Sequence, residues 1–109
     1  MKINMIKILS HIESIIRNGI EKINEATTSD DIRRLTNYYI GSTNTIIEMS
    51  NEIDDDDISE DVAEIGFMLA RDVWTAAVRS AAKIHDSELV AKAAGKRDEA
   101  MQELKALRA

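Results

Sequence analysis

Hydrophobic residues in this chain recur every three or four positions, which is the period of an α-helix and not of a β-strand. In the first run this spacing predicts a helix over about residues 3–25, with one face turned toward a core: Met5, Ile8, Ile12, Ile15, Ile16, Ile20 and Ile23. The turn-like dipeptide Asn18-Gly19 does not change the phase of the pattern. We therefore expect this glycine inside the helix, at a cost of roughly 1 kcal/mol relative to alanine.

The second run alternates spacings of three and four residues, which is a heptad seam. It predicts a helix over about residues 30–53 with this seam: Ile32, Leu35, Tyr39, Ser42, Ile46, Met49 and Ile53. Ser29 or Asp30 is the expected N-cap, because short polar side chains accept hydrogen bonds from the first free backbone N–H groups. Residues 41–45 (Gly-Ser-Thr-Asn-Thr) are poor helix formers and predict a kink or a local break.

The third run predicts a helix over about residues 59–85, opened by a capping box of Asp57 and Glu60. Its apolar residues occupy one stripe with Val62, Ile65, Leu69, Val73, Ala76 and Ile84, and an adjoining stripe with Phe67, Trp74, Val78 and Ala81. A helix that is apolar over most of its circumference is either central in the fold or carries an exposed binding face.

The last run predicts a helix over about residues 87–108, capped by Ser87. It is rich in alanine and charged residues, and its apolar seam is thin: Val90, Ala94, Met101 and Leu104. Four helices of similar length with short connections favour one all-α domain over residues 1–109, an antiparallel four-helix bundle. If residues 85–88 only bend the chain, the alternative is a helical hairpin followed by one long C-terminal helix that dimerises.

Charge is distributed unevenly. The net charge of −6 arises from residues 51–70, which hold eight carboxylates and no basic residue. We call residues 52–64 the acidic segment; its carboxylates are Glu52, Asp54, Asp55, Asp56, Asp57, Glu60, Asp61 and Glu64. They form a candidate docking surface for a basic partner, or an imitation of nucleic-acid phosphates. The simpler interpretation is a solvated connection between two helices.

Aromatic and apolar residues give further candidate contacts. Tyr38 and Tyr39 are adjacent on a helix and point about 100° apart, so only one can face the core and the other is available for a partner. The wide apolar face of the third helix and the thin seam of the fourth predict a homodimer. It would bury either Phe67, Trp74 and Val78, or Val90, Met101 and Leu104.

Signatures of chemistry are missing. The chain has no cysteine, and neither His11 nor His85 has the preceding glutamate of a di-iron Glu-x-x-His motif. The carboxylates from Asp54 onward lack the glycine of a calcium-binding loop. No nucleophile motif and no phosphate-binding glycine pattern occur. We therefore expect no metal, no cofactor and no enzymatic activity.

These observations predict a small, soluble, acidic, cytoplasmic helical protein. It would bind a protein partner with a basic surface and act by occupying that surface, as an adaptor, assembly factor or inhibitor. An alternative is a nucleic-acid-mimicking inhibitor of a DNA- or RNA-binding protein, of the kind that phages encode against host defence. Direct binding of nucleic acid is not expected, since the sequence pI is about 4.9. No secretion signal or membrane segment is expected either.

Overall fold

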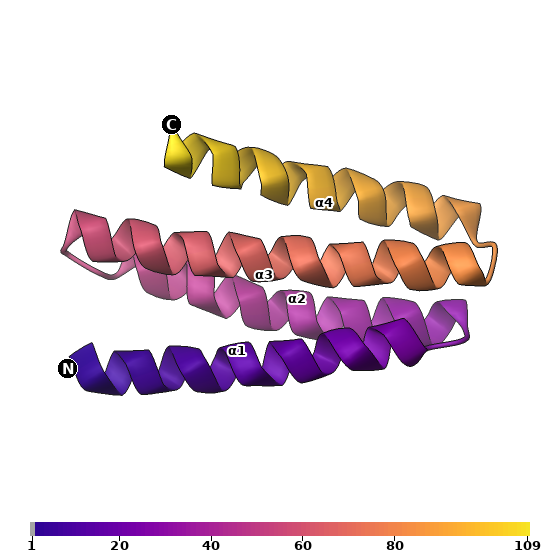
Figure 1. The fold of residues 1–109 in the computed structure, drawn as a ribbon, viewed down its shortest axis with the longest axis horizontal. Coiled ribbons are helices and arrows are strands. Elements are labelled where there is room, and N and C mark those ends of the chain that lie inside the picture. The colour runs from indigo at the N-terminus through magenta and orange to yellow at the C-terminus, as the bar shows by residue number, and fades with distance from the viewer. Residues whose placement is uncertain (1) are drawn as a thin grey trace.

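The computed structural model describes the backbone of residues 2–109 and the side chains of residues 4–109. It consists of four helices: α1 (Lys2–Glu25), α2 (Ser29–Asn51), α3 (Asp56–Lys83) and α4 (Ser87–Arg108) (Figure 1). Successive helices run in opposite directions, and the described residues contain no strand. The predicted all-α four-helix bundle is confirmed.

The arrangement is built around α3. This helix packs against all three others, whereas α4 packs mainly against α3 (Figure 1). The Cα atoms extend over 45 × 28 × 14 Å, so the bundle is flattened. The prediction that the third helix is central follows from its two apolar stripes, which are needed to cover neighbours on two sides.

The core lies where α1, α2 and α3 meet. Its fully buried large side chains come from all three helices: Ile16, Ile23, Ile32, Ile46, Leu69 and Val73. Two glycines let the helices approach closely. A Cβ atom on Gly19 would overlap the ring of Tyr39, and one on Gly66 would lie 2.7 Å from Ile47 Cγ1. The helical position predicted for Gly19 is thus explained by contact with α2.

The three observed N-caps each lie one or two residues before the predicted ones. Thr28, and not Ser29 or Asp30, accepts a hydrogen bond from the N–H of Asp31. Asp55, and not Asp57, accepts from the N–H of Ile58, so α3 begins at Asp56. Asp86, and not Ser87, accepts from the N–H of Leu89. Several acidic or hydroxyl residues stand side by side at each start, and the sequence alone does not distinguish between them.

The alternative of one long C-terminal helix is wrong, because α3 ends in a Schellman motif. His85 has a φ of 60°, its N–H donates to the carbonyl of Ala82, and the N–H of Asp86 donates to the carbonyl of Ala81. Glycine usually occupies this left-handed position. Because a histidine stands at this position instead of glycine, the end of the helix could not be predicted from the sequence.

The predicted break at residues 41–45 is also absent, since α2 is helical throughout. The hydroxyl of Thr43 donates to the carbonyl of Ile40 at 2.8 Å, and that of Thr45 donates to the carbonyl of Gly41 at 3.2 Å. These bonds satisfy the hydroxyl groups inside the helix. Packing of Thr43 and Ile46 in the interior compensates for the weak helix propensity.

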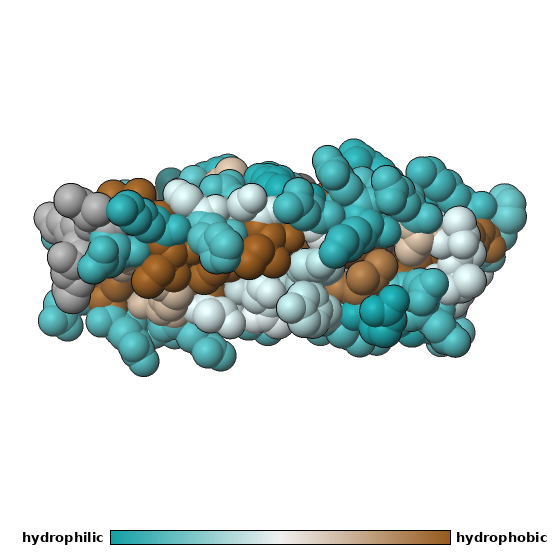
Figure 2. All heavy atoms as spheres, turned by 90° about the horizontal axis from the view of Figure 1, so that it is seen from below, coloured by the Kyte–Doolittle hydropathy of each residue, from teal (hydrophilic) through white to brown (hydrophobic). Residues whose placement is uncertain are grey.

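Two residues predicted to face the core are exposed. Ile8 and Ile15 retain 50% and 39% of their surface, and Ile6 nearby retains 62%. Figure 2 shows the molecule from the side of α1, where hydrophobic residues form a band along the surface. The prediction counted more apolar positions on the first helix than α2 and α3 can cover.

Candidate functional site

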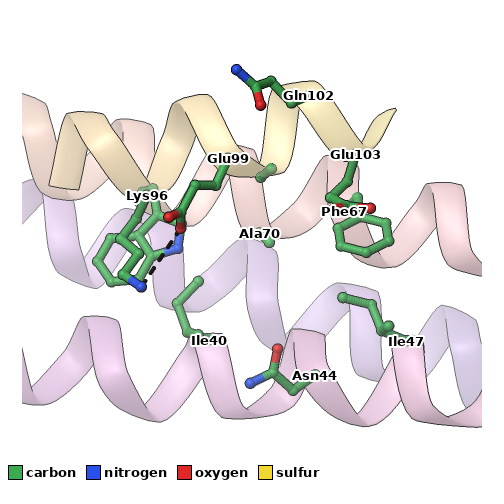
Figure 3. A pocket seen from close by; sticks show the side chains of 11 residues that line it. Ile40, Asn44, Ile47, Phe67, Ala70, Lys96, Glu99, Gln102 and Glu103 are labelled. Carbon is green, nitrogen blue, oxygen red and sulfur yellow. Dashed lines mark ion pairs between the residues drawn. The ribbon is translucent and has the colours of Figure 1, made fainter. Parts of the chain in front are cut away.

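A groove with a volume of about 650 Å³ lies between α2 and α4 (Figure 3). Its floor is the face of α3 that carries Phe67, Ala70 and Trp74. One wall consists of Ile40, Asn44 and Ile47 from α2. The other wall is formed by α4, through Lys96, Glu99, Ala100, Gln102 and Glu103. We call this feature the α2–α4 groove.

Helical periodicity aligns these residues. Phe67 and Trp74, Ile40 and Ile47, and Lys96 and Glu103 are each seven residues apart, so each pair lies on one side of its helix. Because neighbouring helices are antiparallel, Phe67 shares one end of the groove with Ile47 and Glu103. Ile40 and Lys96 lie toward the other end (Figure 3). The apolar floor is therefore about two helical turns long.

The two walls are connected at only one end. The hydroxyl of Ser29, at the start of α2, donates to Asp86 Oδ2 at 2.6 Å, and Arg33 lies 3.7 Å from the same carboxylate. The Ser29 hydrogen bond, the N–H of Leu89 and the Arg33 charge hold the pKa of Asp86 below its ordinary value. Away from this anchor, α4 diverges from α3 toward its C-terminus (Figure 1).

Charges differ between the ends of the groove. Lys96 and Glu99 pair at 3.6 Å on the α4 wall, and exposed Lys92 lies one turn before Lys96. Glu103 borders the Phe67 end. Glu60 and Asp56 precede Phe67 by seven and eleven residues, so they continue the same face of α3 beyond the groove. The Phe67 end is acidic and the opposite end is mixed.

The acidic segment occupies the connection between α2 and α3 and the first turns of α3. Seven of its eight carboxylates are exposed, namely all but Glu64, which is half-buried and pairs with Arg108 at 3.2 Å. Asp55 serves as the α3 cap. By helical spacing Asp56 and Glu60 continue the groove face of α3 beyond the groove, whereas Glu64 pairs with α4 and does not line the groove.

The two predicted tyrosines are divided between core and surface. Tyr39 is 5% exposed and lies against Gly19, while Tyr38 is 66% exposed and forms a T-shaped pair with the Tyr39 ring, with centroids 4.9 Å apart. Tyr38 stands on the flank of α2 that adjoins α1. It does not belong to the α2–α4 groove.

The residues of the two alternative dimer faces lie in different environments. Phe67 and Trp74 belong to the groove, and half-buried Val78 and Val90 pack against the core. Leu104 is buried against α3, with Met101 exposed beside it. Sequence analysis missed the α2 and α4 walls, because Asn44 and the charged residues of α4 look like ordinary solvated positions. The sequence feature that pointed to the groove was the second apolar stripe of α3, because the apolar seam of α4 is too narrow to cover it.

Two features are not found among the described residues. Nowhere do three histidine or acidic side chains converge as metal ligands would. None of the four helices has the length and hydrophobicity needed to cross a bilayer.

No family model, curated protein or solved structure matches this chain.

Proposed function

We propose that this protein binds a protein partner by accepting one amphipathic, basic α-helix of that partner in the α2–α4 groove. In doing so it occupies a surface that the partner uses elsewhere, as an adaptor, assembly factor or inhibitor does. The observation that carries the proposal is the groove, whose aromatic floor has no helix of the described chain covering it.

Shape supports a helical guest. The floor lies between two helices that both pack on α3 but are separated from each other, which leaves the position of an additional helix in the layer open. Binding of an amphipathic helix in such a groove is a recurrent recognition mode, with apolar anchors at positions one or two turns apart. Phe67 and Trp74 are the expected counterparts of these anchors, since aromatic residues dominate interface energetics.

Charge supports a basic guest. Glu103, Glu60 and Asp56 continue from the apolar floor in one direction, and these exposed side chains have no basic partner among the described residues. A guest helix with lysine or arginine at this end would meet opposite charge. Such complementarity mainly accelerates association and fixes orientation.

Trp74 provides the experiment, because it is the only tryptophan of the chain. The probe is a synthetic Leu/Lys amphipathic peptide of about 18 residues, which forms about five helical turns. We expect saturable binding that shifts Trp74 emission and weakens as salt rises. A matched Leu/Glu peptide should not bind.

Variants locate the binding. Asn44→Arg places a long cationic side chain in the groove wall and should abolish the emission change. Thr45→Arg, one residue away on the exposed side of α2, should not. Glu103→Lys should weaken binding up to about fivefold, consistent with about 1 kcal/mol for an exposed pair. Equal effects of the two arginine variants, or no binding of the Leu/Lys peptide, would refute the proposal.

The nucleic-acid-mimic function is a second candidate. Asp56 and Glu60, and Asp57 and Asp61, are exposed pairs four residues apart on the first turns of α3. Side chains at this spacing project about 5–6 Å apart on a helix. Carboxylates carried on a helix keep a fixed spacing, which imitation of a phosphate backbone requires.

An arginine-rich peptide without an apolar face separates the two functions. If the acidic segment acts alone, this peptide binds, and neutralising Asp54, Asp56, Asp57 and Glu60 to the amides abolishes binding while Asn44→Arg has no effect. Asp55 is retained because it caps α3. If the groove is the site, the arginine-rich peptide binds far more weakly than the Leu/Lys peptide.

A further inference from the structure

Residues 4–15 of α1 form the least covered apolar segment of the described chain. Three of its isoleucines are among the exposed large hydrophobic residues, and none of residues 4–15 is fully buried. Figure 2 shows the resulting hydrophobic band on the α1 side of the molecule. Contiguous apolar surface of this kind usually marks an interaction site.

The exposed isoleucines lie on two flanks of α1. Arg17 pairs with Asp72 of α3 at 2.7 Å, and Ile6, eleven residues earlier, shares that flank. Gly19 contacts Tyr39 of α2, and Ile15 and Ile8 precede it on the opposite flank. We call this second flank the isoleucine stripe; it comprises Ile8 and Ile15 with half-buried Met5 and Ile12 beside them.

The molecule has more surface than its mass requires. Its accessible surface is 6818 Å², whereas a compact monomer of 12.2 kDa has about 6,100 Å². Its radius of gyration is 14.4 Å, against about 13 Å for a compact chain of 109 residues. The excess follows from the flattened shape of the bundle, which leaves flanks of its outer helices uncovered, the isoleucines of α1 among them.

We propose that the isoleucine stripe is the contact surface between two copies of this chain. Helix α1 of one copy lies antiparallel to α1 of the other, and the twofold axis passes between His11 and Ile12. Ile8 of each copy then lies opposite Ile15 of the other copy. The stripe is thereby self-complementary, as a twofold contact requires.

The border of the stripe suits a symmetric contact. Its exposed edge carries Asn4, His11 and Asn18, which hold no permanent charge, so the axis does not bring fixed like charges together. The stripe and the α2–α4 groove lie on opposite flanks of α2. Both grooves therefore remain open in the dimer, and the dimer does not depend on the proposed function.

Sedimentation of the cysteine-free chain at tens of micromolar tests the dimer. We expect twice the monomer mass for the native chain and the monomer mass for the double variant Ile8→Lys/Ile15→Lys. Ile6→Lys is the matched control, because the same residue type on the same helix is even more exposed but lies on the other flank. It should remain dimeric.

Cross-linking tests the antiparallel arrangement without disturbing the stripe. The chain has no cysteine, so a single introduced cysteine can only join two copies. His11→Cys should be joined efficiently by a short bis-maleimide. Lys22→Cys should not, because the two positions would lie about 30 Å apart along antiparallel helices.

Several results would overturn the proposal. They are a native chain that sediments as a monomer, Ile8→Lys/Ile15→Lys remaining dimeric, Ile6→Lys becoming monomeric as well, or Lys22→Cys cross-linking as well as His11→Cys. Vesicles containing anionic lipid serve as the rival probe. A monomeric chain that binds them through Ile8 and Ile15 would assign the stripe to a membrane surface instead.

Discussion

Helices α3 and α4 lie side by side but differ in how their neighbours cover them. Ten of the 28 residues of α3 are buried, and they include Leu69 and Val73. Only four of the 22 residues of α4 are buried, and two of these are alanines. Because apolar burial is the main stabilising term in folding, α3 holds the bundle together and α4 covers only part of it. The groove exists as a consequence of this difference.

The difference also shows why a helix of high propensity can contribute little to a core. Alanine, lysine and glutamate favour the helical state of α4, but their side chains bury little apolar area against α3. The central helix also contains alanine and charged residues, but it adds β-branched and aromatic residues that require neighbours. Variants of residues in α3, in α4 and at their N-caps test this difference between the two helices.

Truncating a leucine in each helix compares their packing directly. Leu69→Ala should lower the free energy of unfolding by about 3–5 kcal/mol, because the cavity is enclosed on all sides. Leu104→Ala should cost about 2 kcal/mol, since the open side of α4 can relax. Urea denaturation followed by circular dichroism measures both. Equal losses would show that α4 is packed as firmly as α3.

The same glycine-to-alanine change should have opposite signs in the two helices. Gly66→Ala places a Cβ atom 2.7 Å from Ile47 Cγ1 and should destabilise the fold by about 1–3 kcal/mol. Gly95→Ala meets no atom within 4 Å and should stabilise it by up to about 1 kcal/mol through helix propensity. Thermal unfolding of the two variants measures both changes in stability. A lower stability of Gly95→Ala would indicate that Gly95 contacts a neighbour on α4.

The start of α3 tests the cap assignment. Asp55→Ala removes the acceptor of the Ile58 N–H and should cost about 1 kcal/mol. Asp57→Ala should change stability by less than about 0.5 kcal/mol, as an exposed substitution away from a cap does. Both variants remove one carboxylate of the acidic segment, so they have equal net charge. If Asp57→Ala were the costlier change, the predicted capping box would be correct after all.

The start of α4 has a different cap, because Asp86 is also bonded to α2. Its pKa lies below the ordinary value of 3.8, chiefly through the hydrogen bond from Ser29. The charged form therefore stabilises the fold above about pH 4, and this contribution is lost as the pH falls through the lowered pKa. Asp86→Asn keeps a capping acceptor but has no titrating carboxylate.

Denaturation at pH 7, 5 and 3 measures this small effect. The native chain should be more stable than Asp86→Asn at pH 7 and 5, and the difference should shrink at pH 3. A difference that stays constant with pH would mean that the Asp86 charge does not anchor α4 to α2.

Periodicity was sufficient to predict the four helices, because every apolar run lacks proline and the last three have capping residues at their start. Periodicity failed where tertiary contacts determine whether a helix continues or ends. The threonine-rich part of α2 remains helical because Thr43 is buried in the interior. At the end of α3, His85 adopts a left-handed backbone conformation that glycine usually occupies. Neither outcome depends on a local sequence pattern.

The groove was predictable only in part. Spacing placed Phe67 and Trp74 on a second apolar stripe of the third helix, as a core or dimer face, and both line the groove. The contribution of Ile40, Asn44 and Ile47 depends on how far α4 stands from α2, which no spacing within one helix reveals. The assignment of Ile8 and Ile15 to the core failed for a related reason, since helical periodicity identifies an apolar face but not how wide a strip its neighbours cover.

Helix α4 follows the other three helices in the sequence, and this order has a consequence for the sequence of events during synthesis. Helices α1, α2 and α3 contain most of the buried residues and leave the ribosome first, so we expect them to assemble while α4 is still being made. Until α4 docks, the whole second stripe of α3 faces solvent on the nascent chain. Helix α4, with its 22 residues, then acts as a late cover for a preformed core and is completed about one to four seconds after α3 at ordinary elongation rates.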